Sequence, residues 1–208
     1  MKIAFVLFGL LVSVKAVAHP VSYKGATGVM TWNQPFMSDH WLTYSFRPDM
    51  AVAGRFMRMN MPDGRLNFSG LQFDYLAYRQ NEIDSQANLY LYAAGGEAAF
   101  DGRSRGAGLV GIEADAESRK YFALIKAETM RGEDVPDFDH VEGRIGVAPY
   151  EAEYNEVASW LMVQAQWHPT LEKKFVITPL ARFFYRSVLW ETGVSTDGDW
   201  MMNFMFHF

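Results

Sequence analysis

The sequence predicts an all-β protein, a transmembrane antiparallel β-barrel of about 12 strands within a range of roughly 8–12. Apolar and polar residues alternate along most of the chain, and turn residues separate stretches of about ten residues. Of the 208 residues, 50% are hydrophobic and 15% aromatic, yet the mean hydropathy is only −0.10. This composition excludes a polytopic helical membrane protein, which needs several apolar runs of about 20 residues, and a disordered chain, which is poor in aromatic residues.

Cysteine content and charge exclude further classes of protein. The chain has no cysteine, which rules out a disulfide scaffold, a cysteine-ligated zinc site and a thiol nucleophile. The formal net charge of −5 provides no basic footprint, so we expect no nucleic-acid partner.

The first residues have the pattern of a secretory signal peptide, assigned to 1–18. Lys2 precedes an apolar run over 3–14, and Ala16 and Ala18 supply the small residues of a cleavage site. The run is too short to span a bilayer, although a buried N-terminal helix remains the alternative. Cleavage after Ala18 would leave one domain, the barrel over 19–208, beginning with His19.

Alternation with period two identifies the individual strands. In the clearest stretch, Leu89 and Leu91 share one face while Tyr90 and Tyr92 share the other. Counting such stretches predicts strands at 24–34, 39–47, 51–61, 65–79, 86–96, 106–115, 119–130, 138–148, 155–167, 173–184, 187–195 and 199–208.

Turn residues mark several strand boundaries. Pro62, Asp63 and Gly64 form a tight-turn signal, and 95–106 and 131–139 are predicted as longer loops. Two segments, 114–130 and 151–166, are rich in helix formers and could be helices instead.

The alternation fits a membrane barrel or a water-soluble β-sandwich. Aromatic residues near predicted strand ends favour the barrel, because they match the girdles at the two membrane interfaces. These residues are Trp41, Tyr78, Trp167, Tyr185 and Trp200. Ionisable residues in mid-strand also favour it, because a solvated lumen tolerates them.

The last segment, 200–208, resembles the C-terminal strand of bacterial outer-membrane β-barrel proteins. Phe204, Phe206 and Phe208 occupy alternate positions, and the chain ends on Phe208. The resemblance implies a location in the outer membrane of a Gram-negative bacterium, in contact with its lipid and reached by secretion across the inner membrane. It also implies recognition by the barrel-assembly machinery and both termini in the periplasm.

The predicted function is a narrow pore that passes small solutes. A barrel of about twelve strands can hold a narrow lumen, and rings of mixed charge select solutes by charge and size. The candidate lumen residues are Asp74, Glu113, Glu142, Arg144, Arg182 and Glu191. The same charges could instead pair across the lumen and plug it.

A second hypothesis is copper handling, because the chain has 12 methionines. Met201 and Met205 share a predicted lumen face with His207, and His19 would become the N-terminal residue after cleavage. Thioether and imidazole groups suit copper, especially Cu(I). Met57, Met59 and Met61 also share one face, although Met fills gaps and tolerates a lipid-facing position.

A hydrolase and a purely structural barrel are further alternatives. Asp137, Asp139 and His140 are the nearest approach to an acid–histidine site that could activate water. No His-x-Ser pair occurs, and we assign no catalytic residue. The sequence therefore favours a barrel without enzymatic activity.

Overall fold

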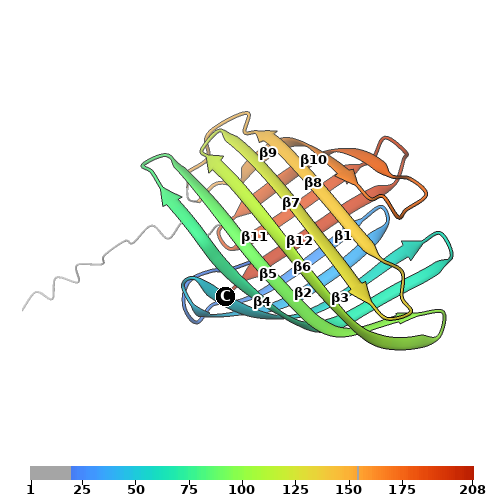
Figure 1. Ribbon diagram of the computed structural model, residues 1–208. Coiled ribbons are helices and arrows are strands. Elements are labelled where there is room, and N and C mark those ends of the chain that lie inside the picture. The colour runs from blue at the N-terminus through green and yellow to red at the C-terminus, as the bar shows by residue number, and fades with distance from the viewer. Residues whose placement is uncertain (1–19, 154) are drawn as a thin grey trace, which may run out of the picture.

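The computed structural model describes residues 20–153 and 155–208, which form a closed barrel of twelve antiparallel strands (Figure 1). Each strand pairs with its neighbours in sequence, and β1 pairs with β12 to close the barrel. The strands are β1 (Thr27–Gln34), β2 (Met37–Arg47), β3 (Met50–Met61), β4 (Gly64–Asn81), β5 (Ser85–Phe100), β6 (Arg103–Ser118), β7 (Tyr121–Gly132), β8 (Phe138–Val147), β9 (Ala158–Trp167), β10 (Phe175–Tyr185), β11 (Val188–Val194) and β12 (Trp200–His207). The predicted fold class is confirmed, whereas the predicted signal peptide and His19 lie outside the described residues.

One predicted loop is wrong. The segment 95–106 is not a loop, because β5 continues to Phe100 and β6 begins at Arg103. Only Asp101 (φ 49°) and Gly102 (φ 72°) connect them, and positive φ at both positions is typical of a tight two-residue hairpin turn. Alanine and glycine replace large apolar residues along this hairpin, so the alternation of hydrophobicity is weak there. The predicted loop 131–139 shortens to 133–137.

Neither of the two possible helices forms. The segment 114–130 belongs to β6 and β7, and the part of 151–166 from Ala158 onward belongs to β9. In the described part of the chain, no helix has the length and apolar character needed to cross a membrane.

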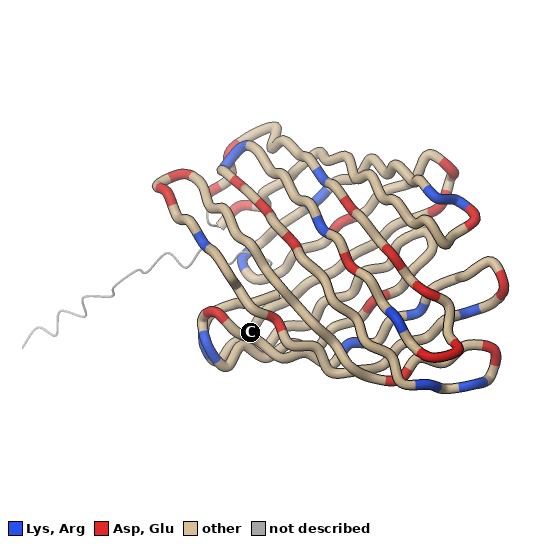
Figure 2. Tube along the Cα trace, in the orientation of Figure 1, with Lys and Arg blue, Asp and Glu red and all other residues tan. Residues whose placement is uncertain are grey.

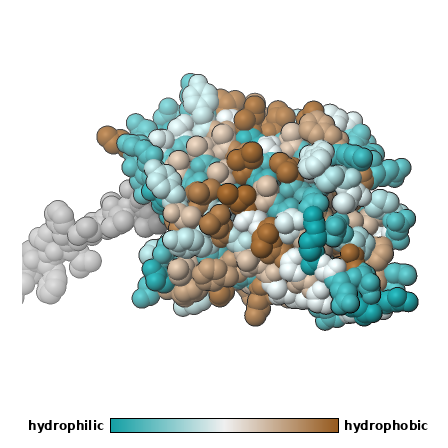
Figure 3. Space-filling model, viewed as in Figure 1, coloured by the Kyte–Doolittle hydropathy of each residue, from teal (hydrophilic) through white to brown (hydrophobic). Residues whose placement is uncertain are grey.

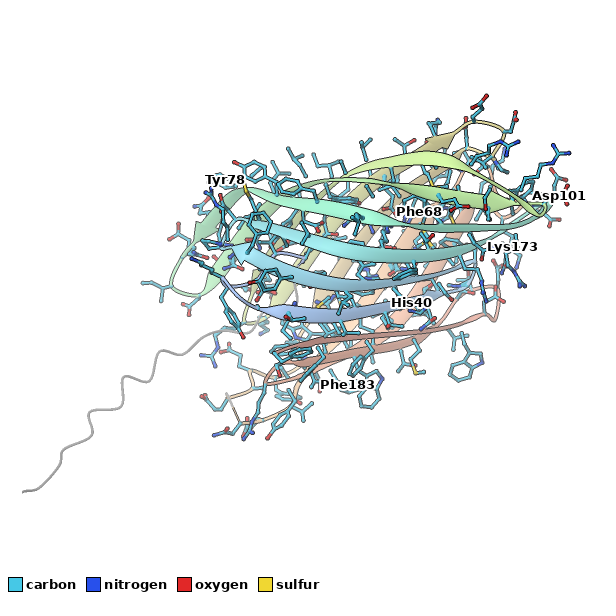
Figure 4. All side chains as sticks on the ribbon, turned by 90° about the horizontal axis from the view of Figure 1, so that it is seen from below. His40, Phe68, Tyr78, Asp101, Lys173 and Phe183 are labelled. Carbon is cyan, nitrogen blue, oxygen red and sulfur yellow. The ribbon has the colours of Figure 1, made fainter. Side chains whose placement is uncertain are left out.

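The turns divide between two ends of the barrel. The termini end holds the start of β1, Phe208 and the turns 48–49, 82–84, 119–120, 148–157 and 186–187. The far end holds the turns 35–36, 62–63, 101–102, 133–137, 168–174 and 195–199. In Figure 4, Tyr78 lies near the termini end, whereas Asp101 and Lys173 lie at the far end. Charged residues gather at both ends and also occur along the strands between them (Figure 2).

The outer wall is apolar between the two ends. Large hydrophobic side chains such as Leu42, Leu71 and Leu161 are 57–75% exposed, and Figure 3 shows brown side chains between two hydrophilic ends. Such a belt is what a lipid-facing wall requires.

Four of the five predicted girdle residues are exposed at an end of this belt. Tyr78 and Tyr185 lie near the termini end, and Trp167 and Trp200 near the far end. The prediction for Trp41 is wrong, because this side chain is 3% exposed and faces the lumen, 4.8 Å from the guanidinium of Arg55.

We expect Gly96→Ala to prevent folding, because β4 and β5 approach closely at this residue. A Cβ on Gly96 would overlap the backbone oxygen of Ser69, and relieving that overlap would cost about 3 kcal/mol or more. The neighbouring Gly95→Ala is the control, since its Cβ would meet open space. The measurement is the fraction of refolded protein in a heat-modifiable band, that is, a band that migrates faster on an SDS gel when the sample is not boiled and is lost on boiling. Equal fractions for the two variants would contradict the expectation.

Candidate functional site: a vestibule closed by a plug

A vestibule with a volume of about 620 Å³ opens into the lumen at the termini end. Its mouth is lined by residues of the termini-end turns, including Ile83 and Arg119, and it ends at Gln34 and Met37. These two residues flank the far-end turn 35–36 between β1 and β2. Within the described residues, no side chain of the other far-end turns lines the vestibule, which is therefore a blind cavity.

Acidic side chains outnumber basic ones in the lining of the vestibule. It contains eight acids and five bases, a lining that favours cations over anions. The acids are Asp39, Asp84, Glu113, Asp115, Glu117, Glu142, Glu153 and Glu156, and the bases are Arg119, Lys126, Arg144, Arg182 and Arg186. Of the predicted lumen residues, Glu113, Glu142, Arg144 and Arg182 line this space. Asp74 and Glu191 are buried on the same inner face, behind its lining.

A buried ion-pair network centred on Arg55 joins β2, β3, β4 and β7 beside the vestibule, whose lining includes the Arg55 partner Asp39. Arg55 is fully buried, and its Nη2 lies 2.7 Å from Asp39 on β2 and 2.9 Å from Glu128 on β7. Its Nη1 donates to Gln72 at 2.9 Å, and Gln72 donates to Asp74 at 2.7 Å. Because β2 and β7 are not neighbours in the sheet, these contacts join opposite sides of the barrel.

A second network joins β8, β10, β11 and β12. Arg144 lies 2.6 Å from Glu142 and 3.0 Å from Glu191. Glu191 also binds Arg182 at 2.7 Å and accepts from Asn203 at 2.8 Å. Four of the six predicted lumen residues thus pair with one another, Glu142 with Arg144 on one strand and Arg182 with Glu191 between neighbouring strands.

Apolar side chains fill the lumen between the Arg55 network and the far end, and we call them the plug. Met57, Met59, Phe68 and Phe138 are at most 2% exposed. The remaining buried members are Phe36, Met37, Met61, Leu66, Tyr92, Ala94, Ala98, Leu109, Met130 and Leu171. The lumen is therefore closed by two layers: the Arg55 network, which is the charged layer, and the plug, which is the apolar layer.

Two histidines join the plug to the charged layer. The rings of His140 and His168 stack with centroids 4.3 Å apart, and His168 also contacts Phe36 at 3.8 Å between centroids. His140 Nδ1 lies 3.1 Å from Glu128. Burial and the neighbouring His140 lower the pKa of His168, which lies in the far-end turn, to about 3, so its imidazole is neutral at neutral pH.

The possible acid–histidine site is not assembled. Asp139 and His140 are adjacent in β8 and therefore point to opposite faces of the wall. Asp139 binds Arg131 at 2.8 Å on the outer side, while His140 is buried in the lumen.

The predicted copper ligands are only partly brought together. Met201, Met205 and His207 all face inward, but Met201 and Met205 are four residues apart on one strand, about 14 Å. They belong to two separate apolar clusters, Met201 with Phe122 and Met205 with Met30. One ion cannot bind both sulfur atoms. Among the described residues, no group of three His, Asp or Glu side chains is placed to hold a metal ion.

Sequence comparison finds no protein-family model and no curated protein that matches the chain. Solved outer-membrane barrels are similar in fold. The match to the KdgM porin covers 88% of this chain and 96% of the porin, with 7% sequence identity and a TM-score of 0.48. The match to the KdgM porin in complex with disordered oligogalacturonate covers the same shares of the two chains, with 8% identity and a TM-score of 0.46. The match to a loop-deletion variant of the outer membrane protein OmpT of Vibrio cholerae has 9% sequence identity and a TM-score of 0.29. It covers 88% of this chain and 96% of the OmpT variant. No residue of this chain takes a role from these similarities.

Proposed function

We propose that this chain is an outer-membrane β-barrel that forms a narrow, gated passage for small solutes with a preference for cations. The observation that carries the proposal is the blind vestibule, which brings a charged, water-accessible space to the layer that closes the lumen. A barrel with a purely structural role does not need such a space.

The apolar belt and the aromatic residues at its two ends support a location within a bilayer. The C-terminal strand supports the outer membrane, because Phe204 and Phe208 are exposed on the lipid-facing side, as the resemblance implies. With both termini in the periplasm, the vestibule opens to the periplasm and the plug faces the outside of the cell.

The passage opens when the plug and the Arg55 network rearrange. The two layers differ in chemistry, since one is held by buried ion pairs and the other by packing. Solutes that enter from the periplasmic side would meet acidic residues near the mouth, such as Asp84 and Glu117, before the plug.

Conductance in planar bilayers tests this proposal. We expect brief, cation-selective openings, and we expect Glu142→Gln to lower the preference for K⁺ over Cl⁻. Removing one charge from the vestibule wall is worth about 1 kcal/mol, or roughly a fivefold change in the permeability ratio. The measurement is the reversal potential under a KCl gradient.

Glu97→Gln is the matched control, because Glu97 is an exposed residue that does not line the vestibule. The proposal fails if neither the natural chain nor a variant with an opened plug conducts ions.

A further inference from the structure

The methionines are segregated to the inside of the barrel. Nine of the eleven methionines in the described residues are buried, whereas only Met202 is largely exposed on the lipid-facing wall. The outer belt instead uses Leu, Ile, Val and aromatic residues. Tolerance of a lipid-facing position therefore does not account for where most of the methionines lie.

Three of these methionines converge where the vestibule meets the plug. Met37 on β2 faces Met59 on β3 directly, which places their Cβ atoms about 5 Å apart. Met57 on β3 pairs with Asp39, which lies two residues after Met37 on β2. Met57 is therefore the diagonal neighbour of Met37, and their Cβ atoms lie about 7 Å apart. All three are at most 4% exposed and belong to one contact cluster. Three flexible thioether side chains can thus surround one ion.

A buried imidazole packs against the residue next to Met37 in the chain. Phe36, which precedes Met37, packs on the ring of His168, and Leu171 from the same turn packs in the plug. Neither ring nitrogen of His168 has a partner in hydrogen-bonding geometry, although the backbone of Asp139 lies close enough to interact with the ring. This buried imidazole is available as a further soft ligand.

The ligand set and the local charge favour a soft monovalent cation. Thioether sulfur and neutral imidazole prefer Cu(I) and, by the same softness, Ag(I). A divalent ion among neutral ligands in a dry site would pay a larger desolvation cost. Arg55 lies 3.7 Å from the sulfur of Met57, but Asp39 and Glu128 balance its charge.

We propose that Met37, Met57 and Met59 form a binding site for a soft monovalent metal ion, Cu(I) or Ag(I), at the floor of the vestibule, with His168 as an adjacent ligand. Met37 lines the vestibule, so an ion in this space reaches the site directly. The site lies elsewhere than Met201, Met205 and His207. This metal site is independent of the proposed passage function, because the site binds the ion whether or not the barrel conducts.

Titration of the folded full-length chain in detergent with Ag(I), against a competing chromophoric chelator, tests the site. We expect saturable binding that weakens by more than about 100-fold in the Met37→Leu/Met59→Leu variant, since the loss of two ligands exceeds the 10–100-fold typical of lost second-shell partners. Leucine has nearly the same volume as methionine, so the plug remains packed. Met162→Leu/Met201→Leu is the control and should bind Ag(I) as the natural chain does.

Two further measurements make the outcome decisive. A heat-modifiable band shows that each variant is folded, and replacement of all methionines by norleucine removes every sulfur without branching a side chain. If the double variant does not fold, the norleucine protein takes its place and must lose Ag(I) binding. The proposal is overturned if the natural chain binds no Ag(I), if sulfur-free or Met37→Leu/Met59→Leu protein binds it equally, or if the control loses as much affinity. Conductance without Ag(I) binding would overturn the metal site alone.

Discussion

Arg55→Ala is expected to destabilise the barrel by about 3–5 kcal/mol, because it leaves two buried carboxylates without their shared cation. Asp39 and Glu128 are at most 4% exposed, so water does not replace the guanidinium. The measurement is the free energy of unfolding in urea of protein folded in lipid vesicles. The same variant should open more often in bilayers, since the charged layer loses its central residue.

The matched control removes the charges together. Arg55→Met combined with Asp39→Asn and Glu128→Gln keeps the volume and removes both carboxylates that Arg55 neutralises. Because Lys126, 3.5 Å from Glu128, then loses that partner, the triple variant should recover part of the lost stability. If Arg55→Ala and the triple variant were equally unstable, packing around Arg55, rather than its ion pairs, would hold the layer.

Phe68→Ala/Phe138→Ala is expected to turn brief openings into sustained conductance. Both rings are buried in the plug, and each truncation to alanine leaves part of the lumen unfilled. Each Phe→Ala change in a packed core costs about 3–5 kcal/mol, so the folded fraction must be checked by the heat-modifiable band. The measurement is the open probability in planar bilayers.

Phe183→Ala is the control for this pair. Phe183 packs against Trp190 with ring centroids 5.0 Å apart, and in Figure 4 it lies on β10, away from Phe68. Its truncation should leave the open probability unchanged. Sustained conductance from Phe183→Ala, or none from the plug variant, would show that the apolar cluster does not close the lumen.

The fold was predictable because period-two alternation is a local signal. Leu71 and Phe73 face lipid while Gln72 and Asp74 face the lumen, as their parity along one strand requires. Trp41 shows that aromatic character is a weaker criterion than parity. Its ring, near a predicted strand end, suggests the girdle, but Trp41 alternates in phase with the buried Asp39 and Thr43. The hairpin around Asp101 is not predicted by alternation, because small residues weaken the pattern there.

The closed state of the candidate site was less predictable. Parity places Glu142 and Arg144 in the lumen, but it does not say which side chains meet across it. Parity also places Arg55 in the lumen, with the buried Ala53 and Met57, but gives no sign that it is the centre of a network. Its partner Glu128 lies 73 residues away on the opposite wall, so only the curvature of the closed sheet brings the two together.

The pairing of β1 with β12 separates the folding of this barrel into local and global steps. The other eleven pairings join strands that follow one another in the chain, so each can form by zipping a hairpin onto its predecessor. The β1–β12 pairing joins Gly28 to His207 and must close a loop of nearly the whole chain. Until then both strands expose unpaired edges. Substitutions between Gly28 and Asn33 should therefore slow the last step of assembly, while those in the β5–β6 hairpin act on an early one.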